Sequence, residues 1–190
     1  KFDVSTENMS ITFPITLKSL LDTVCAFVGV KHKVSSFINE DIVIDENSDI
    51  FQSSTARDVI GYIAEAACSI PKIDYDGVLA FSWWTDSDLV INENNYSTFV
   101  PNEYSVKRID RLQIRSTEND VGILVGSGTN GYVIQENPFL NFQTHDEGVS
   151  RAQPIYDRLA SFDGYTPGSA KWFADWSYRP GDVITIMFGG

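Results

Sequence analysis

The residues of this chain best suited to nucleophilic catalysis are its two histidines and two cysteines. Such chemistry needs a base held against a Ser, Cys or Thr nucleophile. His32 follows Gly29 just past a predicted helix, and His145 falls in a polar segment, residues 143–148, that we expect to be a loop. Neither histidine lies in a G-x-S-x-G or comparable motif. The sequence therefore offers no nucleophile with a histidine placed to act as its general base.

Cys25 and Cys68 each stand among apolar neighbours on a predicted helix. No cation that would activate a thiol is evident beside either one. Two cysteines also make no disulfide framework. We expect two buried free thiols rather than the nucleophile of a hydrolase.

A calcium-binding loop is suggested by Asp45, Asn47 and Asp49, which copy the first three ligand positions of an EF-hand. However, Ile50 replaces the required glycine, and Ala56 stands where the bidentate glutamate belongs. The sequence therefore excludes an EF-hand.

A looser cation site built from Asp41, Asp45, Glu46 and Asp49 competes with a solvated acidic loop. No spacing among the 26 acidic residues singles out a carboxylate pair for glycoside cleavage. We expect no catalytic residue, no metal site and no enzyme activity.

Residues 126–131 match the dinucleotide-binding pattern G-x-G-x-x-G after a predicted strand. Tyr132, Val133 and Ile134 continue as a strand, so no helix amino terminus would face a phosphate. We expect a glycine-rich hairpin loop and no cofactor.

Aromatic residues offer another chemistry, because amphipathic rings can stack on sugars. The candidates are Trp83, Trp84, Tyr96, Phe99, Trp172, Phe173, Trp176 and Tyr178. Core packing competes with this interpretation for most of them. Adjacent Trp83 and Trp84 point to opposite faces of a regular strand, so we expect one at an interface or partly exposed. Glycan binding stays open beside subunit contact.

Composition limits the classes of partner. A chain of 190 residues with 43% hydrophobic and 13% aromatic content can form a substantial core. The net charge of −12, with 14 scattered basic residues, argues against a general nucleic-acid binder. There is no apolar run of transmembrane length, and residues 1–10 contain no signal-peptide hydrophobic region. We expect no nucleic-acid partner and no membrane insertion.

The most fully specified elements lie in residues 53–84. Ser54 or Thr55 can cap a helix, with Asp58 placed to complete the cap. The helical stripe consists of Ala56, Val59, Ile60, Ile63, Ala64 and Ala67. Pro71 ends the helix, and Asp76-Gly77 predicts a hairpin with a type I′ turn. The return strand, residues 78–84, faces inward with either Leu79, Phe81 and Trp83 or Val78, Ala80, Ser82 and Trp84.

An earlier helix is predicted over residues 17–28, capped by Thr16 and ended by Gly29, and a short strand over residues 41–45. From about residue 95, strand signals dominate: residues 104–109, 111–115, 122–125, 132–134, 168–176 and 182–188. Turns are expected at residues 118–120 and 179–182. One helix, residues 150–162, interrupts them, with Pro154 in its first turn.

These elements predict an α+β chain. A small helix-and-β-hairpin domain would occupy residues 1–90, and a β-barrel-like domain carrying one helix would occupy residues 91–190. The chain does not begin with Met, and Gly189-Gly190 directly follows a predicted strand. We expect it to be a piece of a longer protein.

Three segments in the first half of the chain resemble, in sequence and in order, the insertion domain of phage and prophage tail-tip proteins. They are ITFPITLKSLLDTVCAFVGV, SSFINEDIVID and SSTARDVIGYIAEAACSIPKIDYDGVLAF. The later phrases NEYSVKRIDRLQI, GYVIQENPFL and YDRLASFDGYTPGSAKWFADWSYRPGDVITI are similar to the barrel of the same baseplate hub, or tail-associated, proteins. The resemblance covers nearly the whole chain.

The resemblance implies a structural role without catalytic residues. It implies a trimeric hub in the virion tail tip that contacts distal tail and tail-tube proteins, after assembly in the host cytoplasm. It also implies barrel strands before Lys1 and after Gly190. The alternatives are a glycan-binding module that recognises the host surface and, more weakly, a cell-wall hydrolase fragment.

Overall fold

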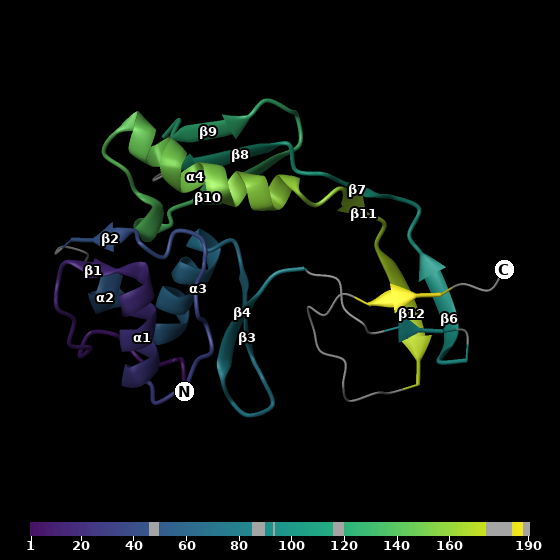
Figure 1. Cartoon of the computed structure of the whole chain (residues 1–190), viewed down its shortest axis with the longest axis horizontal. Helices are drawn as coiled ribbons and strands as arrows, with labels where there is room; N and C mark the ends of the chain where they lie inside the picture. Colours follow the sequence, from purple (N-terminus) through teal and green to yellow (C-terminus); the bar gives the residue numbers. More distant parts are fainter. Residues whose placement is uncertain (46–49, 85–89, 93, 116–119, 174–183, 188–190) are drawn as a thin grey trace.

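The chain contains both helices and strands, and the predicted α+β class is confirmed (Figure 1). The computed structural model describes residues 1–45, 50–84, 90–92, 94–115, 120–173 and 184–187. The helices are α1 (Leu17–Phe27), α2 (Ile50–Ser53), α3 (Ala56–Ala66), η1 (Pro138–Leu140, a 3₁₀ helix) and α4 (His145–Ala160). The strands are β1 (Ile15–Thr16), β2 (Val43–Ile44), β3 (Ile70–Ile73), β4 (Leu79–Ser82), β5 (Val90–Ile91), β6 (Tyr96–Pro101), β7 (Val106–Lys107), β8 (Arg111–Arg115), β9 (Ile123–Gly126), β10 (Gly131–Gln135), β11 (Gly164–Tyr165), β12 (Gly168–Trp172) and β13 (Thr185–Ile186). These strands form sheets of two or three strands and, within the described ranges, no closed barrel.

Capping residues fix both early helices. Thr16 caps α1 as predicted, accepting a hydrogen bond from the backbone of Ser19. For α3 the cap is Thr55, and its side chain and that of Asp58 form a reciprocal capping box. Gly29, at φ +64°, follows the end of α1 in the left-handed conformation that the sequence indicates.

The hairpin of β3 and β4 is present, but the predicted type I′ turn at Asp76-Gly77 is wrong. The amide of Gly77 donates to the carbonyl of Asp74, and Gly77 has φ +75° while Asp76 does not have positive φ. This is a three-residue loop that ends in a glycine bulge. The Asp74 side chain selects it, because its carboxylate accepts bonds from the amides of Asp76 and Val78.

The structure also decides which face of β4 points inward. Leu79 is buried in the core, and Phe81 and Trp83 pack against it. Phe81 meets the ring of Phe37 at a centroid distance of 5.6 Å. The first of the two alternatives is therefore the correct one.

The three-stranded sheet has the order β10-β8-β9, and β8 matches its predicted bounds. Residues 127–130 connect β9 to β10. These two strands lie on opposite sides of β8 and do not pair with each other, so the predicted hairpin loop is wrong. Asp110, at the start of β8, organises the loop: its carbonyl accepts from Gly128 (3.3 Å) and its carboxylate from the amide of Asn130 (2.8 Å). A Cβ at Gly128 would overlap that carboxylate. These amides bind Asp110 rather than a phosphate.

Helix α4 covers this sheet, packing against β8 and β9 (Figure 1). It begins at His145, five residues before the predicted start, and Pro154 lies inside it rather than in its first turn. The N-cap is Thr144, whose hydroxyl accepts from the amide of Glu147. This is a Thr-x-x-Glu capping signal that the apolar pattern alone did not reveal. Residue 145 is consequently helical and not part of a loop.

The segment around η1 joins the three-stranded sheet to the helical layer, which consists of α1, α2 and α3. Phe139 is buried, with its ring centroid 6.1 Å from Tyr62 and 6.3 Å from Phe51. The amide of buried Asn137 donates to the carbonyl of Tyr62 (3.0 Å) and to the carboxylate of Glu65 (2.8 Å). Buried residues from both sides of residue 90 therefore belong to one core. The predicted division into two domains at that position stays a prediction.

The remaining strands follow the predicted pattern only in outline. Strands β7, β9, β10, β12 and β13 fall within or beside predicted segments. The sequence predicts no strand at β1, β5 or β11, and it also misses the longer β6. Strand β6 pairs antiparallel with β12 (Figure 1). The predicted turn at residues 179–182 lies outside the described residues, as does most of the one at residues 118–120.

Gly29, just after α1, and Gly61, inside α3, should respond in opposite ways when alanine adds the same methyl group. A Cβ at either Gly29 or Gly61 would meet nothing within 4 Å. Gly29→Ala should lower the free energy of unfolding by about 1–2 kcal/mol, because alanine is strained at positive φ. Gly61→Ala, inside α3, should raise it by up to about 1 kcal/mol. Urea unfolding of the two variants checks this, and equal effects of the same sign would contradict it.

The capping box should make α3 sensitive to acid. Hydrogen bonds from the backbone amide and the hydroxyl of Thr55 lower the pKa of Asp58. Its contribution to stability is therefore complete above the unfolded pKa of about 3.9 and is lost as pH falls through the lower folded pKa. In urea unfolding below pH ~5, Asp58→Asn should show a shallower loss of stability than the wild type, and parallel curves would refute the assignment. At neutral pH, Thr55→Ala should cost about 1 kcal/mol.

Candidate interaction surfaces

One part of the molecule has no core of its own. We call residues 94–109 and 163–173 the arm; they contain β6, β7, β11 and β12. No residue of the arm is buried, whereas the sheet of β8 to β10 buries Leu112, Ile114 and Ile134 almost completely. Figure 1 shows β6 and β12 standing apart from the helices and from that sheet, whereas β7 and β11 lie near the end of α4. The side-chain amide of Asn130, in the loop before β10, donates to the carbonyls of Lys107 and Arg108.

Strand pairing and a few exposed polar contacts, such as the bond from the Ser97 hydroxyl to the carbonyl of Lys171 and the one between the Ser105 and Thr166 hydroxyls, hold the arm together. Strands β6 and β12 form an isolated antiparallel pair, and so do β7 and β11. Among the arm residues, Val100 is 60% exposed and Phe173 is 72% exposed. Two-stranded ribbons are marginally stable in water, and their open edges can pair with another chain. The arm therefore leaves large apolar side chains such as Val100 and Phe173 exposed.

An aromatic junction of Trp83, Trp84, Phe162 and Tyr165 lies where the chain passes to the arm. The rings of Trp83 and Trp84 stack at 5.9 Å, and Trp84 meets Phe162 edge-on at 4.7 Å and Tyr165 at 5.8 Å. The expectation that the two tryptophans point to opposite faces is wrong, because β4 ends at Ser82 and strand alternation ends with it. Trp84 is 37% exposed, as expected for one of the pair. The rings contact one another rather than forming an open sugar platform.

Arg158 of α4 ties this junction to the body of the molecule, by which we mean α1 to α4, β1 to β4 and β8 to β10. Its guanidinium donates to the carbonyls of Ala67 (3.1 Å) and Cys68 (3.3 Å), just past the end of α3. It also lies 5.8 Å from the ring centroid of Trp83. A cation suits the negative end of a helix. No local pattern in the sequence indicates a role for Arg158, because its partners lie about ninety residues away in the chain.

The other described aromatic candidates belong to the β6–β12 ribbon, where Trp172 is the register partner of Tyr96. Tyr96 and Phe99 lie in β6, and Trp172 and Phe173 lie at the end of β12 and just beyond it. The Tyr96 hydroxyl donates to the carbonyl of Met187. Trp176 and Tyr178 lie outside the described residues.

The residues considered for nucleophilic catalysis are not brought together. His32 binds Asp22, with 2.8 Å between Nε2 and Oδ1, and exposed His145 begins α4. The two cysteines are buried and free, as predicted. Burial raises the pKa of each thiol to about 11, so little thiolate is present at neutral pH. Cys68 does not lie on the helix as expected but follows α3 at φ +46°.

The acidic loop gives no cation site in the part of the chain that is described. Asp41 and Asp45 line a cavity of about 660 Å³ together with Glu147 and Arg151, which form an ion pair with each other. Glu46, Asn47 and Asp49 lie outside the described residues. Within the described ranges, no three His, Cys, Asp or Glu side chains are placed to hold a metal ion.

No helix among the described residues has both the length and the apolar character needed to cross a membrane.

No protein-family model and no curated protein matches this chain. Among solved structures, it is similar to the 43 kDa tail protein of prophage MuSo2 from Shewanella oneidensis, with a TM-score of 0.43 and 16% sequence identity. The similar region covers 82% of this chain and 50% of that one, so this chain matches half of its length. A likeness at this level carries no argument about the role of this chain.

Arg158 should matter more for stability than an exposed arginine. Arg158→Ala should lower the free energy of unfolding by about 1.5–3 kcal/mol, because it leaves the carbonyls after α3 without a charged donor. The control is Arg108→Ala, which removes an exposed ion pair with Asp163 at 3.9 Å and should cost at most about 1 kcal/mol. Equal losses in thermal or urea unfolding would contradict the role given to Arg158.

Proposed function

We propose that this chain is a structural component of a phage or prophage tail tip and acts through protein-protein interfaces rather than catalysis. In this proposal the intact protein forms a homotrimeric hub. It contacts distal tail and tail-tube proteins in the virion and takes part in host attachment.

The observation that carries the proposal is the arm. Its paired strands bury none of their described side chains, so backbone hydrogen bonds and exposed polar contacts hold them rather than apolar burial. An enzyme has no evident need for such a structure, whereas a subunit of an assembly can bury it against a neighbour.

Two further features support a role in a tail tip. The order of the helix, loop, hairpin and strand phrases resembles tail-tip hub proteins over nearly the whole chain. The strongly acidic composition suits a protein that meets other proteins rather than DNA.

Charges placed on the arm should prevent assembly without unfolding the body. Burial of an apolar side chain contributes about 1.5–3 kcal/mol, so Val100→Asp combined with Phe173→Asp should weaken self-association of the intact protein more than about tenfold. Light scattering over a concentration series measures this. We expect a trimer for the wild type and monomers for the double variant, with unchanged thermal unfolding of the monomer.

The matched control places the same two charges on the body. Val121 is 80% exposed and Leu124 is 54% exposed, and neither belongs to the arm. Val121→Asp with Leu124→Asp should leave the trimer intact. A wild type that stays monomeric at micromolar concentration, or a control that dissociates as readily as the arm variant, would count against the proposal.

A further inference from the structure

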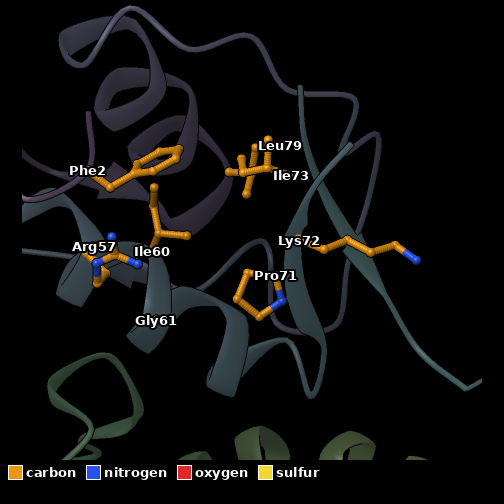
Figure 2. Close-up of a pocket in the computed structure, with 8 residues that line it drawn as sticks. All are labelled: Phe2, Arg57, Ile60, Gly61, Pro71, Lys72, Ile73 and Leu79. Carbon is orange, nitrogen blue, oxygen red and sulfur yellow. The ribbon is translucent and has the colours of Figure 1, made fainter. Parts of the chain in front are cut away.

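A second surface, separate from the arm, lies between α3 and the β3–β4 hairpin. It is a groove of about 190 Å³ lined mainly by Phe2, Ile60, Gly61, Pro71, Ile73 and Leu79 (Figure 2). Past Phe2 and Ile73 it adjoins a second cavity of about 440 Å³, beside Gly29, Val30 and Val78. The floor of this groove is mostly apolar and belongs to the rigid helical layer.

Strand β3 contributes Pro71, Lys72 and Ile73 to the lining of the groove, and among the described residues it pairs only with β4. The amide and the carbonyl of Leu79 bond with Lys31 and Lys33, so they point away from its register partner Ile73. In an antiparallel ladder, the amide and carbonyl of Ile73 must then face the opposite side, toward the free edge of β3. Among the described residues, no backbone carbonyl outside β4 accepts a hydrogen bond from the amide of Ile73. Pro71, two residues earlier, offers a carbonyl but no donor.

The charges around the two cavities differ from those of the whole chain. Lys1, Lys31, Arg57 and Lys72 line them together with a single acid, Asp76, in a chain whose net charge is −12. Arg57 is bound to Asp3, and Figure 2 shows Lys72 extending away from the groove. The second cavity keeps two lysines, Lys1 and Lys31, against the single acid Asp76, which favours an acidic partner over a basic one.

We propose that this groove binds an extended, acidic segment of a partner protein by adding it as a strand to the edge of β3. The incoming strand bonds with Ile73 and the carbonyl of Pro71, and it places an apolar side chain over Gly61. Its acidic residues, at alternate positions, point toward the lysines. Pro71 limits the pairing to a short stretch.

Substitutions at Gly61 separate occupation of the groove from folding. The position is exposed on α3 with open space around it, so Gly61→Leu fills the groove while leucine favours the helix more than glycine does. Gly61→Ala is the matched control, because one methyl group leaves the groove open. Circular dichroism confirms that both variants are folded.

Binding is measured by fluorescence anisotropy with three labelled peptides. The first is Asp-Ile-Asp-Val-Asp-Ile-Asp, the second has Lys at every Asp position, and the third is the acidic peptide with its backbone nitrogens methylated at alternate residues. We expect saturable binding of the first peptide, at least about tenfold weaker binding of the other two, the same loss with Gly61→Leu, and a change within about twofold with Gly61→Ala.

Other outcomes overturn the proposal. These are no binding of the acidic peptide, preference for the basic peptide, or no effect of Gly61→Leu. If the amides of Gly61 and Ile73 shift with protein concentration alone and the acidic peptide does not reverse the shift, a second copy fills the groove and the proposal is wrong. The arm variants should leave peptide affinity unchanged, so a failure of this proposal is distinguishable from a failure of the assembly role.

Discussion

Burial of residues 137–140 against α3 is the constraint on which the body of this protein depends. Phe139 fills the space between the rings of Tyr62 and Phe51, and the side chain of Asn137 bonds α3 from the same segment. Because Asn137 is itself buried, its amide must find partners inside the protein, which fixes the position of the segment. The sheet under α4 and the helical layer consequently share one core.

The arm is the contrasting case, and it explains why interfaces dominate the proposed function. It leaves the body through the aromatic junction, which Arg158 ties to the end of α3. Beyond that junction no described arm residue is buried. Apolar burial is the main stabilising contribution to folding, so a ribbon without it gains most of its stability from whatever covers it. A rigid body with a coreless arm suits a subunit that completes its structure on assembly.

Local sequence signals predicted the parts of the fold that local physics controls. The cap at Thr16, the glycine after α1, the strand β8 and the buried thiols all follow from nearby residues. Features fixed by distant partners were missed or wrong. The loop over Asp110 depends on the order of three strands, the pairing of β6 joins segments about seventy residues apart, and the contacts of Arg158 depend on where α3 ends. The turn after β3 shows the same limit on a small scale, because the Asp74 side chain outweighed the Asp-Gly signal.

We propose that the arm acquires its stability from assembly. Amide hydrogen exchange of the intact protein, resolved by segment and measured from dilute monomer to assembled protein, tests it most directly. We predict that amides of β6 and β12 exchange rapidly in the monomer and become protected on assembly, while those of β8 stay protected throughout. Protection of β6 and β12 that is equal to that of β8 in the dilute monomer would contradict the claim.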